Sequence, residues 1–549
     1  MHLFNLRSLV LGALTCIALA NTIQAYTPEY STAGFYQTDS SLREAINFNV
    51  GWRFIKRDIA GAEATHFDDQ DWTLVNLPNG MELLPLCASG GVNYQGPSWY
   101  RKQFTIDAAL KGRKVMLHFE SIMGKSKIWL NGTLLKENFG SYFPIHIDLS
   151  EHLNYGTENI IAVRADNSND PNFPPGKDQE TLDFTYFGGI YRDAWLITHN
   201  TTYVTHPLAV DKVAGGGVFV HYEDLSEASA RVLVDTDIAN EGTAKIVHLR
   251  LELKDKDGHV VATHSSPVSL PTNGSNTASL EMTVKKPKLW RPDSPHLYDL
   301  FVTIQSASGQ PLDSFRKRIG LRTIEMRGQD GFYLNGKPYP QVLMGANRHQ
   351  DFPHIGHALP NNLHYRDALK LRQTGMRVIR SAHYIQDPAF MDACDELGLF
   401  MVAAIPGWQF WNDQPIFMDR MLQDVRNMVY GQANAPQSPE YSTHTCEGES
   451  TLITFDHVGS GLTTGKALLE DTVYDADDVL GFIVMDAKGK YQRARGKIVA
   501  PNQVRVNHPG ITQPKSIRYG WENFPDANLF GEAKMPAFPF RTDAFSSHK

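Results

Sequence analysis

The chain has 549 residues, a formal net charge of -8, and 42% hydrophobic and 20% charged residues. At about 150 residues per domain, this length predicts roughly three or four globular domains. Nucleic acid and anionic membrane surfaces require a basic patch, and the chain contains no long run of charge. Nucleic acid and anionic membranes are therefore excluded as the main partners of the chain.

The first 25 residues have the features of a signal peptide. Arg7 precedes the short apolar run SLVLGALTCIALA, which ends in small residues, as a secretory signal does. Ala18-Leu19-Ala20 and Ala25 are the two candidate cleavage signals, and an amphipathic or buried first helix is the alternative. No later apolar run is long enough to span a bilayer. We therefore expect a secreted or periplasmic protein with no membrane attachment after cleavage.

Residues 26–205 have the pattern of a β domain. Val115, Leu117 and Phe119 alternate with other residues, and Asn131-Gly132 then separates two further alternating segments. Asn-Gly in this setting is a strong hairpin signal. The pattern predicts two sheets packed face to face in a jelly-roll-like sandwich.

Residues 206–325 predict a second, smaller sandwich. Leu249, Leu251 and Leu253 alternate before the turn at Asp257-Gly258, and Val260 begins a return strand. Short strands at regular spacing are typical of an immunoglobulin-like domain.

Residues 326–429 change to alternating strands and helices. Apolar strands are predicted at 341–344, 377–379 and 399–405, and the last, LFMVAAI, is unbroken as in strands buried on both faces. A helix follows each strand. The second is the best marked, with Asp387 as its cap, Pro388 in its first turn and Gly398 after its end.

This alternation predicts a parallel sheet built from βαβ units. Three units are the opening of a (β/α)₈ barrel, with a doubly wound sheet as the less favoured alternative. Residues 430–549 then return to β-type segments rich in Gly and Pro. A complete barrel needs about 250 residues, so the predicted fold class is multidomain and mostly β, with an incomplete barrel and a β-rich C-terminal segment.

Several motifs stand in order within roughly residues 45–429. They are GGIYRD at 188–193, LWRP at 289–292, FYLNGK at 332–337, GANRH at 345–349 and SAHY at 381–384. Together they resemble glycoside hydrolase family 2, the family of β-galactosidases and β-glucuronidases, although Ile385 stands where the family usually has Pro. The resemblance implies a hydrolase acting on terminal β-galactosides or related β-glycosides, and a carbohydrate partner.

Chemistry in barrels sits at the carboxyl ends of the strands. We therefore expect Asn347, Arg348, His349, His383 and Trp408 to face one mouth. The resemblance implies that His349 and His383 contact the sugar. It also implies that Asp183, and more loosely Asn93, reach the same subsite from the first domain. The alternatives are structural: satisfied histidines, a rim ion pair for Arg348 and a loop cap for Asp183.

The two catalytic carboxylates are missing. Retaining hydrolysis uses a pair of carboxyl groups about 5 Å apart. In the family the acid/base Glu follows an Asn at the end of strand four, and the nucleophile ends strand seven. Here Asn427-Met428-Val429 runs as the family would, but no Asn-Glu pair follows. Asp351 and Asp413 are better interpreted as loop residues, so we predict no catalytic residue, an impaired or inactive hydrolase, and no cofactor or catalytic metal.

The tail, residues 430–549, contains a second ordered set of motifs: SPEY at 438–441, TFDHVGSGL at 454–462, RYGW at 518–521, FPDANL at 524–529 and PFRTD at 539–543. Together they resemble the C-terminal part of a sialate O-acetylesterase. That family's nucleophilic Ser and its His lie upstream of this part. The resemblance therefore favours an in-frame junction near residues 427–431 between a glycosidase and an esterase.

Three functions stay open from the sequence. They are a family 2 hydrolase by descent, a carbohydrate-binding protein without turnover, and an esterase-like protein. A partial barrel exposes a sheet edge and apolar helix faces, so the last 220 or so residues are expected to pack poorly. The oligomeric state does not follow from the sequence.

Overall fold

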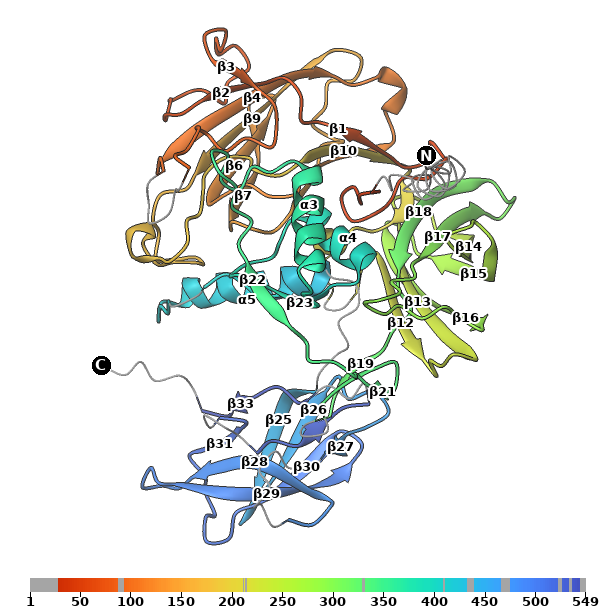
Figure 1. Cartoon of the computed structure of the whole chain (residues 1–549), viewed down its shortest axis with the longest axis vertical. Coiled ribbons are helices and arrows are strands. Elements are labelled where there is room, and N and C mark those ends of the chain that lie inside the picture. Colours follow the sequence, from red (N-terminus) through yellow and green to blue (C-terminus); the bar gives the residue numbers. More distant parts are fainter. Residues whose placement is uncertain are drawn as a thin grey trace, which may run out of the picture.

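The computed structural model describes residues 28–86, 93–210, 212, 215–327, 331–407, 410–431, 439–465, 474–521, 526–532 and 536–543. The predicted signal peptide lies outside them. Within these residues the chain is mostly β and forms several bodies, which confirms the predicted fold class (Figure 1). In the described part of the chain, every helix is too short or too polar to cross a membrane.

The first sandwich packs a six-stranded and a four-stranded antiparallel sheet around one apolar core. The larger sheet runs, in spatial order, β3 (Thr73–Val75), β2 (Trp52–Ile55), β4 (Pro97–Thr105), β9 (Glu158–Asp166), β6 (Lys125–Leu130) and β7 (Thr133–Phe139). The smaller sheet runs β1 (Glu44–Asn47), β10 (Ala194–His199), β5 (Lys114–Phe119) and β8 (Ile145–Asp148). Asn131 and Gly132 both have positive φ between β6 and β7, as the predicted hairpin requires.

The second sandwich also has two antiparallel sheets. One contains β11 (Thr202–Val204), β13 (Ser229–Asn240), β12 (Val218–Glu223) and β16 (Gly274–Lys285); the other runs β15 (Val260–Leu270), β14 (Lys245–Lys254), β17 (Tyr298–Ser306) and β18 (Pro311–Ile319). Its core continues to Met116 on β5 and Ile197 on β10. The two sandwiches therefore pack on each other, and β5 is buried along its whole length rather than on one face as its alternation suggests.

A short three-stranded sheet, β19 (Ile324–Met326), β20 (Phe332–Leu334) and β21 (Lys337–Pro338), leads into the predicted barrel region. There, β22 (Gly345–Arg348), β23 (Val378–Ser381) and β24 (Phe400–Val402) form a parallel sheet. The helices are α3 (Asn361–Gln373), α4 (Pro388–Leu397) and α5 (Pro415–Gly431). Asp387 caps α4 at the backbone N–H of Ala389, and Gly398 ends it in the left-handed conformation, as predicted.

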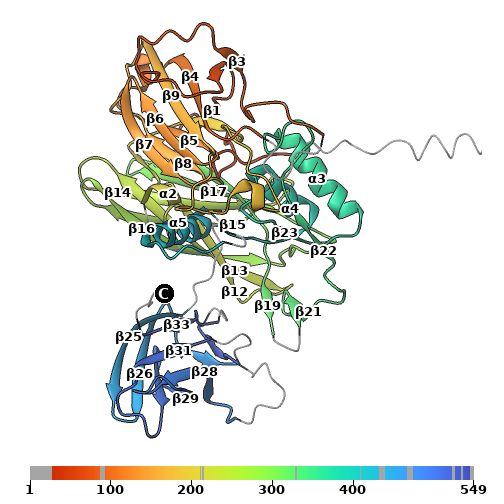
Figure 2. The ribbon, with the colours of Figure 1, turned by 90° about the vertical axis from the view of Figure 1, so that its left-hand side faces the viewer.

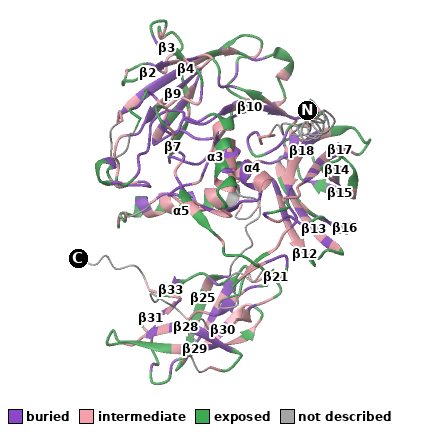
Figure 3. Cartoon of the chain, viewed as in Figure 1, coloured by how far each residue is buried: buried purple, intermediate pink, exposed green. Residues whose placement is uncertain are grey.

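Two strand predictions in this region are wrong in detail. Residues 341–344 lie before β22 instead of in it, and Val342 and Met344 are exposed. The strand predicted to be buried on both faces ends at Val402, which is 51% exposed. Both follow from the same cause: the described sheet has three strands, so no further strands cover its far face. Figure 3 shows β22 largely in the colour of exposed residues.

The helix α5 leaves the parallel sheet and packs on the first sandwich. Arg420 lies 3.8 Å from the ring centroid of Phe139 and donates to the carbonyl of Asn172 at 3.0 Å. The amide of Asn412 donates to the carbonyl of Pro171 at 2.7 Å. In Figures 1 and 2, α5 lies below the first sandwich.

The C-terminal segment forms a body of its own at the lower end of the molecule in both Figure 1 and Figure 2. Its antiparallel sheet runs β25 (Glu440–Glu447), β26 (Ser450–Asp456), β30 (Gln503–Asn507), β29 (Tyr491–Ala500), β28 (Asp478–Met485), β31 (Ser516–Tyr519) and β33 (Phe540–Arg541), and β27 (Thr463–Thr464) pairs with β32 (Leu529–Phe530). Ile453, Phe482, Val504 and Tyr519 belong to one buried cluster. The expectation of poor packing is therefore wrong for this segment, because its strands close around their own core.

Candidate functional site

Two histidines meet where the parallel sheet faces the first sandwich. His349 follows β22 and His383 follows β23, and their ring centroids lie 5.3 Å apart at an interplanar angle of 82°. Phe184, from the loop before β10, lies 5.6 Å from each ring. The carboxyl ends of adjacent parallel strands thus bring together two residues 34 positions apart in sequence, and the sandwich supplies an aromatic face beside them.

Burial lowers the pKa of both histidines. The charge of Arg380 lowers the pKa of His383 further, while the charge of Asp183 raises the pKa of both. Both imidazoles are therefore neutral near pH 7, so each offers one N–H donor and one acceptor. Such groups suit sugar hydroxyls, and Asp183, which is exposed, is within electrostatic reach of the pair.

Arg380 on β23 connects the candidate residues. Its guanidinium lies 2.9 Å from Nδ1 of His383 and donates to the side-chain oxygen of Asn347 at 3.4 Å. Asn347 is exposed on β22. The structure thus places Asn347, His349, His383 and Asp183 in one neighbourhood.

Arg348 points away from this neighbourhood. It donates to Oε1 of Gln386 at 2.6 Å and to Oδ2 of Asp367 at 2.9 Å, and its guanidinium lies 3.9 Å from the ring centroid of Phe390. It is buried between β22 and the helices α3 and α4. The prediction that it faces the common mouth is wrong, because adjacent strand residues point to opposite faces. The ion pair of Arg348 with Asp367 fits the alternative interpretation of this residue, a structural ion pair at the rim.

The other two predicted residues are not placed with the cluster. Asn93 donates to the carbonyl of Tyr94 at 3.4 Å, beside the first sandwich. Trp408 lies outside the described residues.

A second layer behind the histidines was not predicted. Tyr384 stacks on Tyr142 of the first sandwich, with centroids 4.1 Å apart and an angle of 4°. Its hydroxyl lies 3.1 Å from Nε2 of His357, which also contacts Oδ1 of Asp351 at 2.7 Å. The SAHY motif already contains Tyr384, but no sequence signal points to His357 or Phe184.

The carboxylates near this site do not form a hydrolytic pair. Asp351 pairs with His357, and Asp413, on the loop before α5, accepts from Nε1 of Trp411 at 2.6 Å. Glu120 and Asp193 are a buried pair, and burial and their mutual repulsion raise the pKa of Glu120, while burial and the charge of Asp387 raise the pKa of Asp193 to about 6. Glu120 accepts a hydrogen bond from Trp195 and Asp193 accepts one from Asn49, both within the first sandwich, so their place is structural.

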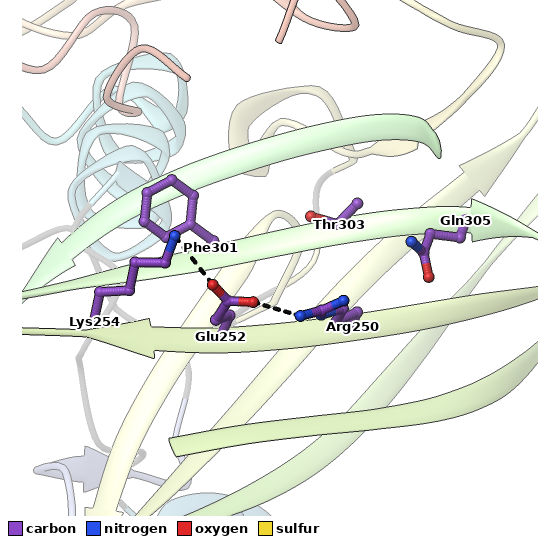
Figure 4. A pocket seen from close by; sticks show the side chains of 6 residues that line it. All are labelled: Arg250, Glu252, Lys254, Phe301, Thr303 and Gln305. Atoms are coloured by element: carbon purple, nitrogen blue, oxygen red, sulfur yellow. Dashed lines mark hydrogen bonds and ion pairs between the residues drawn. The ribbon is translucent and has the colours of Figure 1, made fainter. Parts of the chain in front are cut away.

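A hollow on the second sandwich is unconnected with these residues (Figure 4). Its lining comes from the outer faces of β14 and β17. Glu252 there bridges Arg250 at 2.7 Å and Lys254 at 3.0 Å, and Lys254 lies 4.5 Å from the centroid of Phe301. These charges satisfy one another, so the hollow is an ordinary solvated sheet face.

Comparison with known families gives three adjoining matches. Residues 59–200 match the sugar binding domain of glycosyl hydrolases family 2, residues 216–322 match glycosyl hydrolases family 2, and residues 324–437 match that family's TIM barrel domain. The resemblance seen in the sequence is thereby confirmed for the sandwich, immunoglobulin-like and barrel parts. The domain boundaries themselves stay predictions.

Individual relatives of the chain belong to the same classes of glycosidase. The chain is 33% identical over 398 residues to a β-galactosidase of Thermoanaerobacter pseudethanolicus, covering 72% of this chain and 50% of the relative. It is 31% identical over 381 residues to a β-glucuronidase of Formosa agariphila, covering 67% of this chain and 38% of the relative. The chain thus spans half or less of the length of these two relatives.

Solved structures show the same relation. A β-glucuronidase from glycoside hydrolase family 2 superposes with a TM-score of 0.67 at 27% identity, over 72% of this chain and 43% of that one. A β-glucuronidase of Bacteroides uniformis gives 0.65 at 29% identity, over 72% and 46%.

Proposed function

Since residues 59–437 belong to glycosyl hydrolases family 2, we propose that the chain recognises the terminal sugar of β-galactosides or related β-glycosides. The proposed subsite lies at His349 and His383, and glycoside hydrolysis by this chain is impaired or absent. The observation that carries the proposal is the junction of two neutral histidines, one aromatic ring and one exposed carboxylate between the parallel sheet and the first sandwich.

The chemistry of these residues supports sugar binding. Neutral imidazoles donate to and accept from hydroxyl groups, and Asp183 accepts only. Phe184 is 3% exposed and packs against both imidazole rings, so it holds the two histidines in place. His383 is held by Arg380 and Tyr384 is stacked against the sandwich, so little ordering is required on binding.

The sequence after Val429 supports the loss of turnover. It lacks the Asn-Glu pair that the family places on strand four. A proton-transfer role is typically worth about 10²–10⁴-fold in rate, and the covalent route requires the nucleophile. A carbohydrate-binding protein without turnover is therefore the second candidate, and the missing carboxylates favour it.

We also propose that residues 430–549 derive from a sialate O-acetylesterase-like protein, joined near residues 427–431, and that the chain is secreted or periplasmic. The ordered tail motifs and a separate C-terminal core support the first proposal. The N-terminal apolar run supports the second. Cleavage before residue 26 in the exported protein, seen by N-terminal sequencing, tests the latter.

The test combines turnover and binding on the purified chain. We expect background rates on chromogenic β-galactoside, β-glucuronide, β-mannoside and acetyl ester substrates, together with measurable binding of methyl β-galactoside or methyl β-glucuronide in calorimetry. Binding should disappear in the double variant His349→Ala/His383→Ala. It should persist in His152→Ala, which changes an exposed histidine of the first sandwich.

Each outcome decides one point. Clear turnover of a glycoside would show that the argument from missing carboxylates is wrong, and Asp351, Asp413 and Glu522 would be the residues to mutate. Turnover of the acetyl ester alone would favour the esterase alternative. Absence of binding to every glycoside would remove the sugar-recognition proposal.

A further inference from the structure

Three histidines gather between the two sandwiches, away from the proposed sugar site. His118 on β5 and His146 on β8 are direct partners in an antiparallel pair, and their Nδ1 atoms lie 3.2 Å apart. His206, just before the short helix α2 (Pro207–Val210), stacks on His146 with centroids 4.1 Å apart. One ring nitrogen from each of the three lies within 4.8 Å of the others.

The position of the cluster explains why these side chains leave water. The outer face of β5 is covered by the second sandwich, as Met116 in that sandwich's core shows. His118 is buried and the other two are half-buried. Buried polar groups are unfavourable unless each has a partner, and three clustered imidazoles satisfy one another poorly, because a neutral ring has a single N–H.

We propose that His118, His146 and His206 bind one Zn²⁺ ion, which ties the first sandwich to the second. Zinc–nitrogen bonds of about 2.0–2.1 Å in a tetrahedral site place two ligand nitrogens about 3.3 Å apart, which matches the His118–His146 pair. The ring of His206 then moves inward. The fourth position is taken by water, as in three-histidine zinc sites.

The contacts of His206 are compatible with this role. Its ring lies beside the backbone of Ala33, and metal-ligating histidines commonly bond a backbone carbonyl through their second nitrogen. The backbone N–H of Leu208 donates to its Nδ1 at 3.3 Å. This bond is long, so a metal at that nitrogen replaces a weak interaction.

The surrounding charges permit a cation. Arg43 and Lys317 are cations whose charges act on His206. Arg43 is held by both carboxylate oxygens of Asp313, at 3.1 and 2.6 Å, and Lys317 has Asp392 and Asp395 near it, so carboxylates offset both cations.

The test uses the full chain, stripped with chelator and then titrated with ZnCl₂. We expect one Zn²⁺ per chain by elemental analysis and calorimetry, a rise in the unfolding temperature on adding zinc, and tetrahedral visible absorption with Co²⁺ in place of zinc. His206→Gln, at the half-buried position, should abolish stoichiometric uptake and the temperature shift while the zinc-free protein keeps its circular dichroism. His118→Gln serves as the second ligand variant.

The matched control is His248→Gln, which changes a half-buried histidine on β14 outside the cluster and should keep full zinc uptake. The proposal is overturned if the unmutated chain takes up no stoichiometric zinc. It is equally overturned if His206→Gln and His118→Gln bind zinc as the unmutated chain does.

Discussion

Replacing Arg192 should loosen the parallel sheet from the first sandwich. Arg192 is 2% exposed and donates to the carbonyls of Tyr142 at 3.0 Å and Ile385 at 2.7 Å and to Oε1 of Gln350 at 3.3 Å. Its Nε lies 3.6 Å from Asp387. Arg192→Met keeps an unbranched apolar stem but leaves these acceptors and one carboxylate buried without it. Breaking a buried ion pair of this kind costs about 3–5 kcal/mol.

Hydrogen exchange followed by mass spectrometry measures this effect where it acts. A loss of about 3–5 kcal/mol corresponds to roughly 10²–10⁴-fold faster exchange through opening of the segment, and we expect it in peptides covering β22 to α4. Peptides from the C-terminal sheet should be unchanged. Arg250→Met is the control, because that arginine side chain is 50% exposed and its ion pair is worth about 0–1 kcal/mol. Unchanged exchange across β22 to α4 in Arg192→Met would refute the reasoning.

Three further changes test other parts of the structure. His383→Ala should weaken glycoside binding by about 2–10-fold, the value of one hydrogen bond, as measured by calorimetry. Burial raises the pKa of Asp424 on α5 to about 8 from about 3.9 in an unfolded chain. Between about pH 4 and 8 the folded state therefore holds a proton that the unfolded state has lost, and the free energy of unfolding falls by about 1.4 kcal/mol per pH unit. Asp424→Asn should remove this pH dependence of the unfolding midpoint, and an equal dependence in the variant would contradict the reasoning. Gly398→Ala places a Cβ against the carbonyl oxygen of Pro292 at a φ of +75° and should lower the free energy of unfolding by about 2–4 kcal/mol. Thermal unfolding should show a smaller loss for Gly375→Ala, where φ is +92° but the space around the new Cβ is open.

Local signals in the sequence predict the fold wherever the stabilising contacts are also local. The Asn131-Gly132 hairpin and the capped helix α4 depend on residues within one or two turns, and both have the predicted form. The failures depend on distant parts of the chain. The apolar run 399–405 indicates a strand with neighbours on both sides, and Val402 is exposed because those neighbours are missing from the described sheet.

The site was predicted where chain order implies proximity. Strand ends in a parallel sheet lie together, and this places His349 beside His383. The orientation of Arg348 follows from strand alternation and was overlooked. Phe184 and Tyr142 come from the first sandwich, and only the packing of that sandwich on the sheet brings them near.

The parallel sheet is held from outside, which explains how the proposed sugar subsite keeps its order in a described sheet of three strands. Asn361 at the start of α3 donates to Asp193 of the first sandwich at 3.1 Å. Nε1 of Trp290 in the second sandwich donates to the carbonyl of Asp395 in α4 at 2.9 Å, and Gly398 allows close contact there. A complete barrel closes its sheet on itself, whereas this sheet gains its order from the two sandwiches. The residues of the proposed subsite therefore depend on those interfaces, and a variant that loosens the interfaces should lose glycoside binding although every residue of the proposed subsite is unchanged.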